Sequence, residues 1–332
     1  MFEKLVMVTR KTRLEELVER FNTREQARFY IEHMGLDFAD YDVEHTNYQR
    51  AVETLRRTLD GLLSRMQVID RQFLPNFLFS PKDLVVTVGQ DGIVVNTAKY
   101  LDGQPIVAVN PDPARFDGIL LPFSPAAAAT GVIHAAEGAA AVHRITMAEA
   151  TFNDGQRLLA FNDFYIGQRT HVSSRYTLGF EGQRERQSSS GVLVATGAGS
   201  TGWFSSTQNM ADAVTHMLLG EKAPAVPRMR FGWDDPRLAF VVREPFRSKW
   251  SGVTLGAGLI DPGESLAIES HMPESGVVFS DGVEADAIDF NSGSVVDIHA
   301  SKRHTILVAG IPEGTRVRAA PPKWLARSSV LP

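Results

Sequence analysis

A short loop between two apolar segments places a single carboxylate at a point where the chain reverses easily. The segment Val85–Val88 leads into Gly89, Gln90, Asp91 and Gly92, and a second apolar segment follows. In a phosphoryl-transfer site, backbone amides hold phosphates while a carboxylate accepts the proton of the attacking hydroxyl. A plain turn is the competing interpretation, because Asp and Gly suit turn geometry. The loop has neither a Walker sequence nor dinucleotide-fingerprint spacing.

A second loop is rich in small residues and leads into a helix. Three serines, including Ser189, come before an apolar strand, and the run from Thr196 to Gly202 follows that strand. Free amides at a helix N-terminus favour an anion or a ribose hydroxyl, so this run is a candidate nucleotide site. Trp203 offers a face for stacking a base, although a tryptophan in a protein core is equally ordinary.

Two shorter motifs carry carboxylates next to polar or small residues. Asn162 and Asp163 lie side by side between apolar residues, and Asp281 precedes Gly282 in a typical hairpin sequence. Each motif alone indicates no more than a turn. The nine histidines show no metal-ligand spacing, and the absence of cysteine excludes thiolate sites and disulfides. The residues therefore predict no metal site held by the protein.

The elements that must position these loops alternate between strands and helices in the first half of the chain. Strands are expected at 4–9, 66–70, 83–88 and 105–110, and helices at 14–35, 45–63 and 92–103. This order predicts βαβ units and a doubly wound, mainly parallel, Rossmann-like sheet. Ligands bind such sheets at the carboxyl ends of the strands, where Asp91 and Asn110 both lie.

The pattern changes after an alanine-rich segment, 126–145, which predicts a crossing helix near a domain boundary. Short strands then follow one another closely, which indicates an all-β, sandwich-like domain with one helix at 200–220. The strands are expected at 157–167, 174–182, 191–196, 238–244, 264–270, 276–282, 294–301 and 305–311. We therefore divide the chain into an α/β domain, 1–143, a β-rich domain, 144–310, and a tail, 311–332, which we expect to return to the first domain.

Length and charge limit the classes of function. A chain of 332 residues exceeds the usual size of one domain, so two domains are expected. The net charge of −5 argues against nucleic acid as a partner, because a phosphate backbone requires a clustered basic face. No window approaches the roughly 18 apolar residues of a membrane helix, and the N-terminus lacks the apolar core of a secretory signal. We expect a cytoplasmic protein that does not bind membranes.

Taken together, the four loops resemble the NAD kinase family, within the larger group of NAD, diacylglycerol and sphingosine kinases. The family motif Gly-Gly-Asp-Gly-Thr stands here as Gly89–Ile93, and its Asn-Glu or Asn-Asp motif as Asn162–Asp163. The motif Thr-Pro-Thr-Gly-Ser-Thr-Ala-Tyr matches Thr196–Trp203, and a late Asp-Gly matches Asp281–Gly282. The segment 109–118, the three serines and the tryptophan follow the mitochondrial-type branch and its bacterial relatives. The resemblance covers nearly the whole chain.

The resemblance implies a nucleotide site and a reaction. Members of the family transfer a phosphoryl group from ATP to the 2′-hydroxyl of the adenosine ribose of NAD(H), and a divalent metal such as Mg²⁺ accompanies the nucleotide. Asp91 would be the general base, and family members are commonly homo-oligomers, so a dimer or tetramer is expected. The remaining residues that the resemblance assigns to nucleotide binding are Gly89, Gly92, Asn110, Asn162, Asp163, Ser189, Thr196, Gly199, Ser200, Thr201, Trp203 and Asp281. Of these, Thr201 and Trp203 would line the adenine pocket.

Three positions depart from the family pattern, all of them on the side that handles phosphate. Gln90 replaces a glycine, Ile93 replaces a threonine, and Ala198 replaces another threonine. If position 90 required a positive φ, glutamine would be disfavoured there. Two alternatives therefore stay open beside the kinase: an NAD(H)-binding sensor or regulatory protein derived from the kinase fold, and a kinase for a sugar or lipid hydroxyl.

Overall fold

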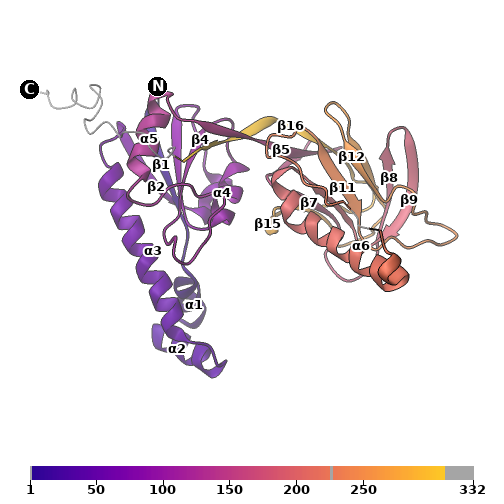
Figure 1. Cartoon of the computed structure of the whole chain (residues 1–332), viewed down its shortest axis with the longest axis horizontal. Helices are drawn as coiled ribbons and strands as arrows, with labels where there is room; N and C mark the ends of the chain where they lie inside the picture. Colours follow the sequence, from indigo (N-terminus) through magenta and orange to yellow (C-terminus); the bar gives the residue numbers. More distant parts are fainter. Residues whose placement is uncertain (1, 225–226, 311–332) are drawn as a thin grey trace, which may run out of the picture. The chain divides into compact units, whose positions relative to one another are not determined.

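The computed structural model describes residues 2–224 and 227–310, which divide into two compact units (Figure 1). The first unit runs to His143 and includes the described residues from Ile306 onward, and the second is Arg144–Thr305. The tail predicted at 311–332 lies outside the described residues.

The first unit is built on a parallel sheet of five strands. From one edge to the other they are β2 (Arg65–Asp70), β1 (Lys4–Thr9), β3 (Asp83–Val88), β4 (Pro105–Val109) and the end of β16 (Val295–Val308). β3 is buried along its whole length, as its run of β-branched residues indicates. The mainly parallel sheet expected from the sequence is confirmed.

Helices cover both faces of this sheet. On one face, α3 (Phe38–Leu59) and α5 (Ala128–Glu137) share an apolar cluster with alternate residues of β1, β3 and β4. On the other face, α4 (Asp91–Ala98) contacts β1 and β3, and none of its buried residues joins that cluster. A parallel sheet with helices on both faces is the doubly wound arrangement.

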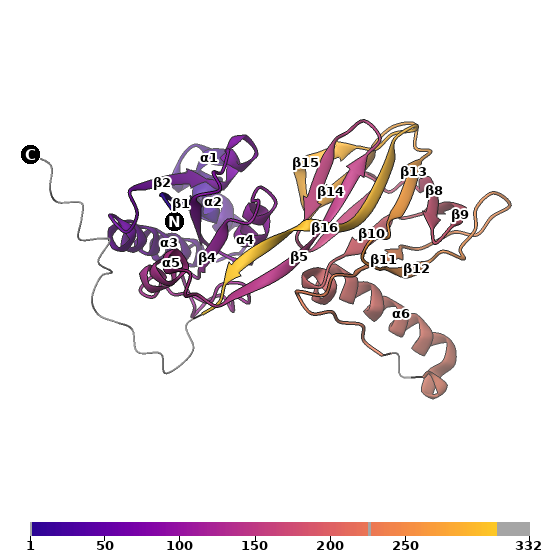
Figure 2. The same ribbon diagram turned by 90° about the horizontal axis from the view of Figure 1, so that it is seen from above.

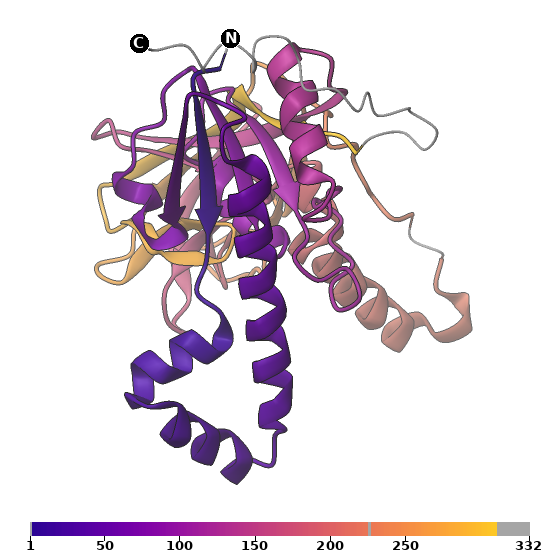
Figure 3. The same cartoon turned by 90° about the vertical axis from the view of Figure 1, so that its left-hand side faces the viewer.

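The helix predicted at 14–35 is two helices, α1 (Arg13–Phe21) and α2 (Arg24–His33). Asn22 adopts the left-handed conformation, with φ of 67°, and ends α1. Thr23 then caps α2 by accepting a hydrogen bond from the amide of Gln26. The pair packs on the first turns of α3 through Leu14, Ala27, Ile31 and Phe38. Figure 3 shows α1 and α2 beyond the end of β1, next to the part of α3 that extends past the sheet.

The second unit is a sandwich of two antiparallel sheets, which confirms the β-rich domain. One sheet has the order β12 (Ala257–Ile260), β11 (Leu238–Val242), β10 (Val192–Ala195), β7 (Asp163–Gln168), β14 (Gly276–Ser280) and β15 (Val283–Asp289). The other contains β16, β13 (Leu266–Ser270), β8 (Ser174–Phe180) and β9 (Gln183–Ser189), with β5 (Val142–Phe152) and β6 (Arg157–Ala160) joined through β16. Large side chains such as Phe164, Tyr176, Phe240 and Phe290 fill the space between the two sheets.

The expected strand at 157–167 is broken in two. β6 ends at Ala160, β7 starts at Asp163, and the two strands belong to different sheets. In contrast, the two strands expected at 294–301 and 305–311 form the single strand β16. β5, β9, β12 and β15 were not predicted. β9 reads QRERQSS, whose polar residues suit an exposed edge strand.

α6 (Trp203–Leu219) lies against the outer face of the six-stranded sheet (Figure 2). Its one buried residue, Phe204, packs on Leu193, Ala195 and Ala239. The first turn of α6 is thereby fixed to the sheet, directly after the small-residue loop. Within residues 2–224 and 227–310, no helix is both long enough and apolar enough to span a bilayer.

Candidate functional site

The loop after β3 begins with a glycine whose conformation excludes a side chain. Gly89 has φ of 155°, is buried, and donates its amide to the carbonyl of Val109 at 3.2 Å. A Cβ atom there would lie 3.3 Å from Cγ2 of Ile93 and 3.4 Å from Nε of Arg10. By contrast, Gly92 is exposed and has no neighbour within 4 Å of such an atom. The loop is therefore tightly packed at Gly89 and open at Gly92.

Asp91 is the first residue of α4 and its side chain is half-buried. Its Oδ1 accepts a hydrogen bond from the backbone amide of Leu120 at 2.8 Å. Its Oδ2 forms no hydrogen bond to another of the residues the structure describes. One oxygen therefore fixes the carboxylate, and the other remains available to accept a proton from a ligand hydroxyl.

The substitutions at positions 90 and 93 cause no strain in the loop. Gln90 has φ of −90°, which any residue adopts, so the positive φ considered above is not required. Its side chain is exposed and makes no capping bond to α4. Ile93 is 2 % exposed and packs beneath the loop beside Gly89. A threonine hydroxyl in the same orientation would face the interior, so Ile93 removes little from the exposed side of the loop.

Asn110, at the carboxyl end of β4, organises the next loop. The residue is 4 % exposed, and its side-chain amide donates to the carbonyl of Phe116 at 2.8 Å. Its Oδ1 accepts the amide of Asp112 at 3.0 Å, and its own backbone amide donates to Phe123 at 2.8 Å. All these bonds are internal, so Asn110 shapes the loop that carries Leu120 to Asp91.

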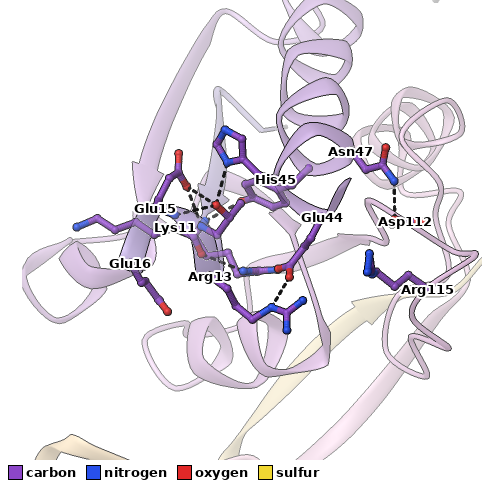
Figure 4. A network of polar contacts seen from close by, with 12 residues as sticks. Lys11, Arg13, Glu15, Glu16, Glu44, His45, Asn47, Asp112 and Arg115 are labelled. Atoms are coloured by element: carbon purple, nitrogen blue, oxygen red, sulfur yellow. Dashed lines mark hydrogen bonds and ion pairs between the residues drawn. The ribbon is translucent and has the colours of Figure 1, made fainter. Parts of the chain in front are cut away.

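Arg10 lies at the same edge and was missed by the sequence reasoning. It directly follows β1, and its buried Nε has no hydrogen-bond partner among the described residues. A terminal guanidinium nitrogen of Arg10 donates a hydrogen bond to Glu44 at 3.0 Å. The guanidinium also lies over the aromatic ring of Tyr48, 5.1 Å from the ring centre. Arg13 also pairs with Glu44 (Figure 4). The position of Arg10 after a buried strand was the signal that could have found it.

In the second unit, the structure brings together the other three motifs at one end of β7. Asp281, with φ of 57°, accepts hydrogen bonds from three successive amides at the β6–β7 break. These are Phe161 at 3.0 Å, Asn162 at 2.6 Å and Asp163 at 3.3 Å. The amide of Asp281 in turn donates to the carbonyl of Asp163 at 2.9 Å. Asp281 therefore stabilises the interruption between β6 and β7 at which Asn162 lies.

Asp163 is a buried carboxylic acid. Its side chain is 7 % exposed, and burial together with the charge of Asp281 raises the pKa of Asp163 from 3.8 to about 7. Asn162, beside it, is half-buried, and its side-chain amide has no partner among the described residues. The pair thus offers a ligand an amide and an acid that exchanges its proton near neutral pH.

The loop of small residues, 196–202, is hydrogen-bonded to the same interruption between β6 and β7. Thr196 is fully buried and donates its hydroxyl to the carbonyl of Phe161 at 2.6 Å. A Cβ atom at Gly199 would lie 2.0 Å from the carbonyl oxygen of Asn162, so only glycine fits there. Ser200 is also fully buried, and its hydroxyl donates to Gly197 at 2.8 Å. Thr201 is exposed and its hydroxyl forms no hydrogen bond with another described residue, which leaves that hydroxyl accessible.

Trp203 is stacked on the outer face of the sheet. Its ring lies 5.8 Å from Tyr165 in a nearly parallel orientation, and the guanidinium of Arg243 lies 5.2 Å from it. These residues line a cavity of about 290 Å³ that also includes Phe279. Tyr165 and Arg243 were not singled out from the sequence, although both lie within the strands that it predicts.

Ser189 is placed in the interior. It is 3 % exposed, and its hydroxyl forms a hydrogen bond with that of Tyr176 at 2.7 Å and accepts one from the amide of Gly191 at 3.0 Å.

The predicted site residues form two groups. Gly89, Asp91, Gly92 and Asn110 lie in the first unit, and the others lie in the second. Within the ranges 2–224 and 227–310, no three His, Asp or Glu side chains gather to form a metal site.

The similarity between this chain and known proteins is found in its structure. No protein-family model and no curated protein sequence matches it. The structure of yeast NADH kinase in complex with NADH is similar over 96% of this chain and 91% of its own, with 14% identity and a TM-score of 0.56. An NAD kinase from Archaeoglobus fulgidus, solved in complex with ATP, is similar over 92% of this chain and 94% of its own, with 18% identity and a TM-score of 0.50. Both units of the chain therefore have the fold of the NAD kinase structures.

Proposed function

We propose that this protein belongs to the NAD kinase family and transfers the terminal phosphoryl group of ATP to the 2′-hydroxyl of the adenosine ribose of NAD(H). The observation that carries the proposal is the geometry of Asp91, at the carboxyl end of a buried parallel strand. One oxygen is fixed by the amide of Leu120, and the other is free of partners in the described chain. The fold, shared with an NADH kinase and an NAD kinase, supports it.

In this proposal each group has one task. Asp91 accepts the proton of the 2′-hydroxyl as that oxygen attacks the phosphorus, and ADP leaves with the electron pair of the broken bond. Asn162 and Asp163 bind the adenosine end of NAD(H), and Thr201 and Trp203 bind the adenine. Mg²⁺ enters with ATP as part of the substrate, because Mg²⁺ keeps several waters and binds through substrate phosphates rather than in a cage made by the protein alone.

The assay that tests this function measures NADP(H) formation from NAD or NADH, with ATP or polyphosphate as donor. We expect Asp91→Asn to lower kcat by a factor of about 10²–10⁴, the usual contribution of a general base, while NAD(H) binds as before. Asp117→Asn is the matched control, since Asp117 is an exposed carboxylate on the neighbouring loop. Equal turnover by the wild-type protein and Asp91→Asn would rule out the assignment of Asp91. A sugar or lipid panel covers other hydroxyl substrates.

Gln90 favours a second candidate, an NAD(H)-binding sensor without kinase activity. Its exposed side chain forms no capping hydrogen bond and lies at the N-terminus of α4, where phosphates would approach the backbone amides. This candidate predicts NAD(H) binding by calorimetry without ATP turnover. Gln90→Gly would then create or increase turnover, because it uncovers those amides. Rapid NADP(H) formation by the unmodified protein would exclude the sensor.

A further inference from the structure

A chain of contacts connects helix α3 with the carboxylate of Asp91. The connection runs through the loop from Asn110 to Leu121, whose far end donates the amide of Leu120 to Asp91. At its near end, the side-chain amide of Asn47 on α3 donates to Oδ2 of Asp112 at 2.8 Å (Figure 4). Asn47 does not touch Asp91 itself, so any influence must pass through the loop.

The loop between these two points is held rigidly. The carbonyl of Asp112 accepts the amides of Arg115 at 3.0 Å and Phe116 at 3.1 Å, which closes a turn. The carbonyl of Phe116 in turn accepts the buried amide of Asn110. Gly118, with φ of 61°, packs against that same amide, since a Cβ atom at Gly118 would lie 2.7 Å from it. A displacement of Asp112 therefore moves the segment that carries Leu120.

A second contact also joins α3 to the loop but is more exposed. Arg115 forms an ion pair with Asp40, whose side chain is 47% exposed. Solvent-exposed ion pairs contribute little, because water and salt screen them. The Asn47–Asp112 bond is half-buried and has one charged partner, which makes it the stronger anchor.

We propose that Asn47 and Asp112 are positioning residues for Asp91: their bond fixes the loop so that the amide of Leu120 holds the carboxylate in its reactive orientation. The catalytic part of this inference, that the bond supports the rate of phosphoryl transfer, rests on the proposed function. The structural part, that the bond fixes the loop carrying Leu120, does not. α3 thereby takes a role in catalysis although it contributes no group to the reaction.

The structural part is tested by amide hydrogen exchange at Leu120, with three variants. Asn47→Asp places two carboxylates face to face, and we expect exchange at Leu120 to become about tenfold faster as the loop loosens. Asp112→Asn keeps an acceptor for Asn47 and should have a smaller effect. The double variant rebuilds the bond with donor and acceptor exchanged, so the wild-type exchange rate should return. Unchanged exchange in Asn47→Asp would overturn the proposal.

Gln49→Glu is the matched control on the same helix. Gln49 donates to Glu15 at 2.9 Å, so this variant also opposes two carboxylates, but it does so away from the loop. It should leave exchange at Leu120 unchanged. A general loosening of α3 would instead affect both variants equally, and that outcome would contradict a specific route through Asp112.

The catalytic part is tested by steady-state kinetics on the same proteins. Asn47→Asp should lower kcat about tenfold with little change in KM for NAD(H), because small misplacements of a reacting group reduce rate before affinity. The double variant should recover kcat. If the wild-type protein forms no NADP(H), the proposed function fails while the exchange experiment still decides the structural part. If it turns over and Asn47→Asp has normal kcat, the positioning role fails alone.

Discussion

The two groups of candidate residues use carboxylates in opposite ways. In the first unit, Asp91 takes one backbone amide on one oxygen and keeps the other free of partners in the described chain. In the second unit, Asp281 takes three amides on its two oxygens. A carboxylate saturated by amides stabilises the fold, whereas a partly satisfied one can still exchange a proton with a ligand. The contrast separates a candidate for chemistry from a residue that builds the framework around it.

The glycines of the two groups differ in the same sense. Gly92 stands open beside Asp91, while Gly199 lies against the backbone of Asn162. A loop that needs glycine for packing is inflexible, and it presents its neighbours in one conformation. A glycine with open space beside it leaves room for a ligand. The loop around Gly199 in the second unit is therefore a preformed surface, and the loop around Gly92 in the first unit leaves space for a ligand.

The largest effect that tests this contrast is on stability. Asp281→Ala should lower the free energy of unfolding of the second unit by about 4 kcal/mol, because three amides lose their acceptor. Asp91→Ala, which frees only the Leu120 amide, should cost about 1 kcal/mol. Urea denaturation of both variants measures the difference. Similar losses in the two variants would mean that Asp91 is also a framework residue.

The second test compares alanine at the two glycines. Gly199→Ala should destabilise the protein by about 3 kcal/mol, since the added methyl meets a carbonyl oxygen and the backbone must shift. Gly92→Ala should be neutral or slightly stabilising, because alanine is preferred within α4 and meets no atom. We expect Gly92→Ala nevertheless to slow NADP(H) formation. A fully active Gly92→Ala would show that the phosphates do not approach this residue.

The sequence predicted the parts of the fold that depend on periodicity and loop chemistry. The buried strand before Gly89 and the parallel order of the first sheet follow from apolar runs that alternate with amphipathic helices. The convergence of Asn162, Thr196 and Asp281 was expected only from the resemblance, because each is a plain turn when taken alone. The structure joins these three within the second unit through specific hydrogen bonds.

Other features depended on contacts that no local pattern contains. The break between β6 and β7 is stabilised by Asp281, which lies more than a hundred residues away in the sequence. The bond between Asn47 and Asp112 joins a helix to a loop 65 residues later. β9 has no apolar alternation because it forms an edge, so its sequence does not indicate a strand. Long-range pairing decided these elements, and local propensity did not.

The smallest expected effect concerns the proton on Asp163. Burial and Asp281 raise the pKa of Asp163 from 3.8 to about 7, so between about pH 4 and pH 7 the native state binds a proton that the unfolded state has lost. Stability therefore falls as the pH rises through this window, by about 2 kcal/mol once water and structural relaxation have reduced the full effect of the shift.

Asp163→Asn should remove that loss, because an amide does not titrate. Urea midpoints at pH 5 and pH 8 should then differ less in the variant than in the wild-type protein. Asp154→Asn is the control: hydrogen bonds from Gln156 lower the pKa of Asp154, so its titration falls below the window. If Asp163→Asn kept the wild-type pH dependence, the acid would be ionised in the native state. The contrast between the two groups of candidate residues would then rest on Asp281 alone.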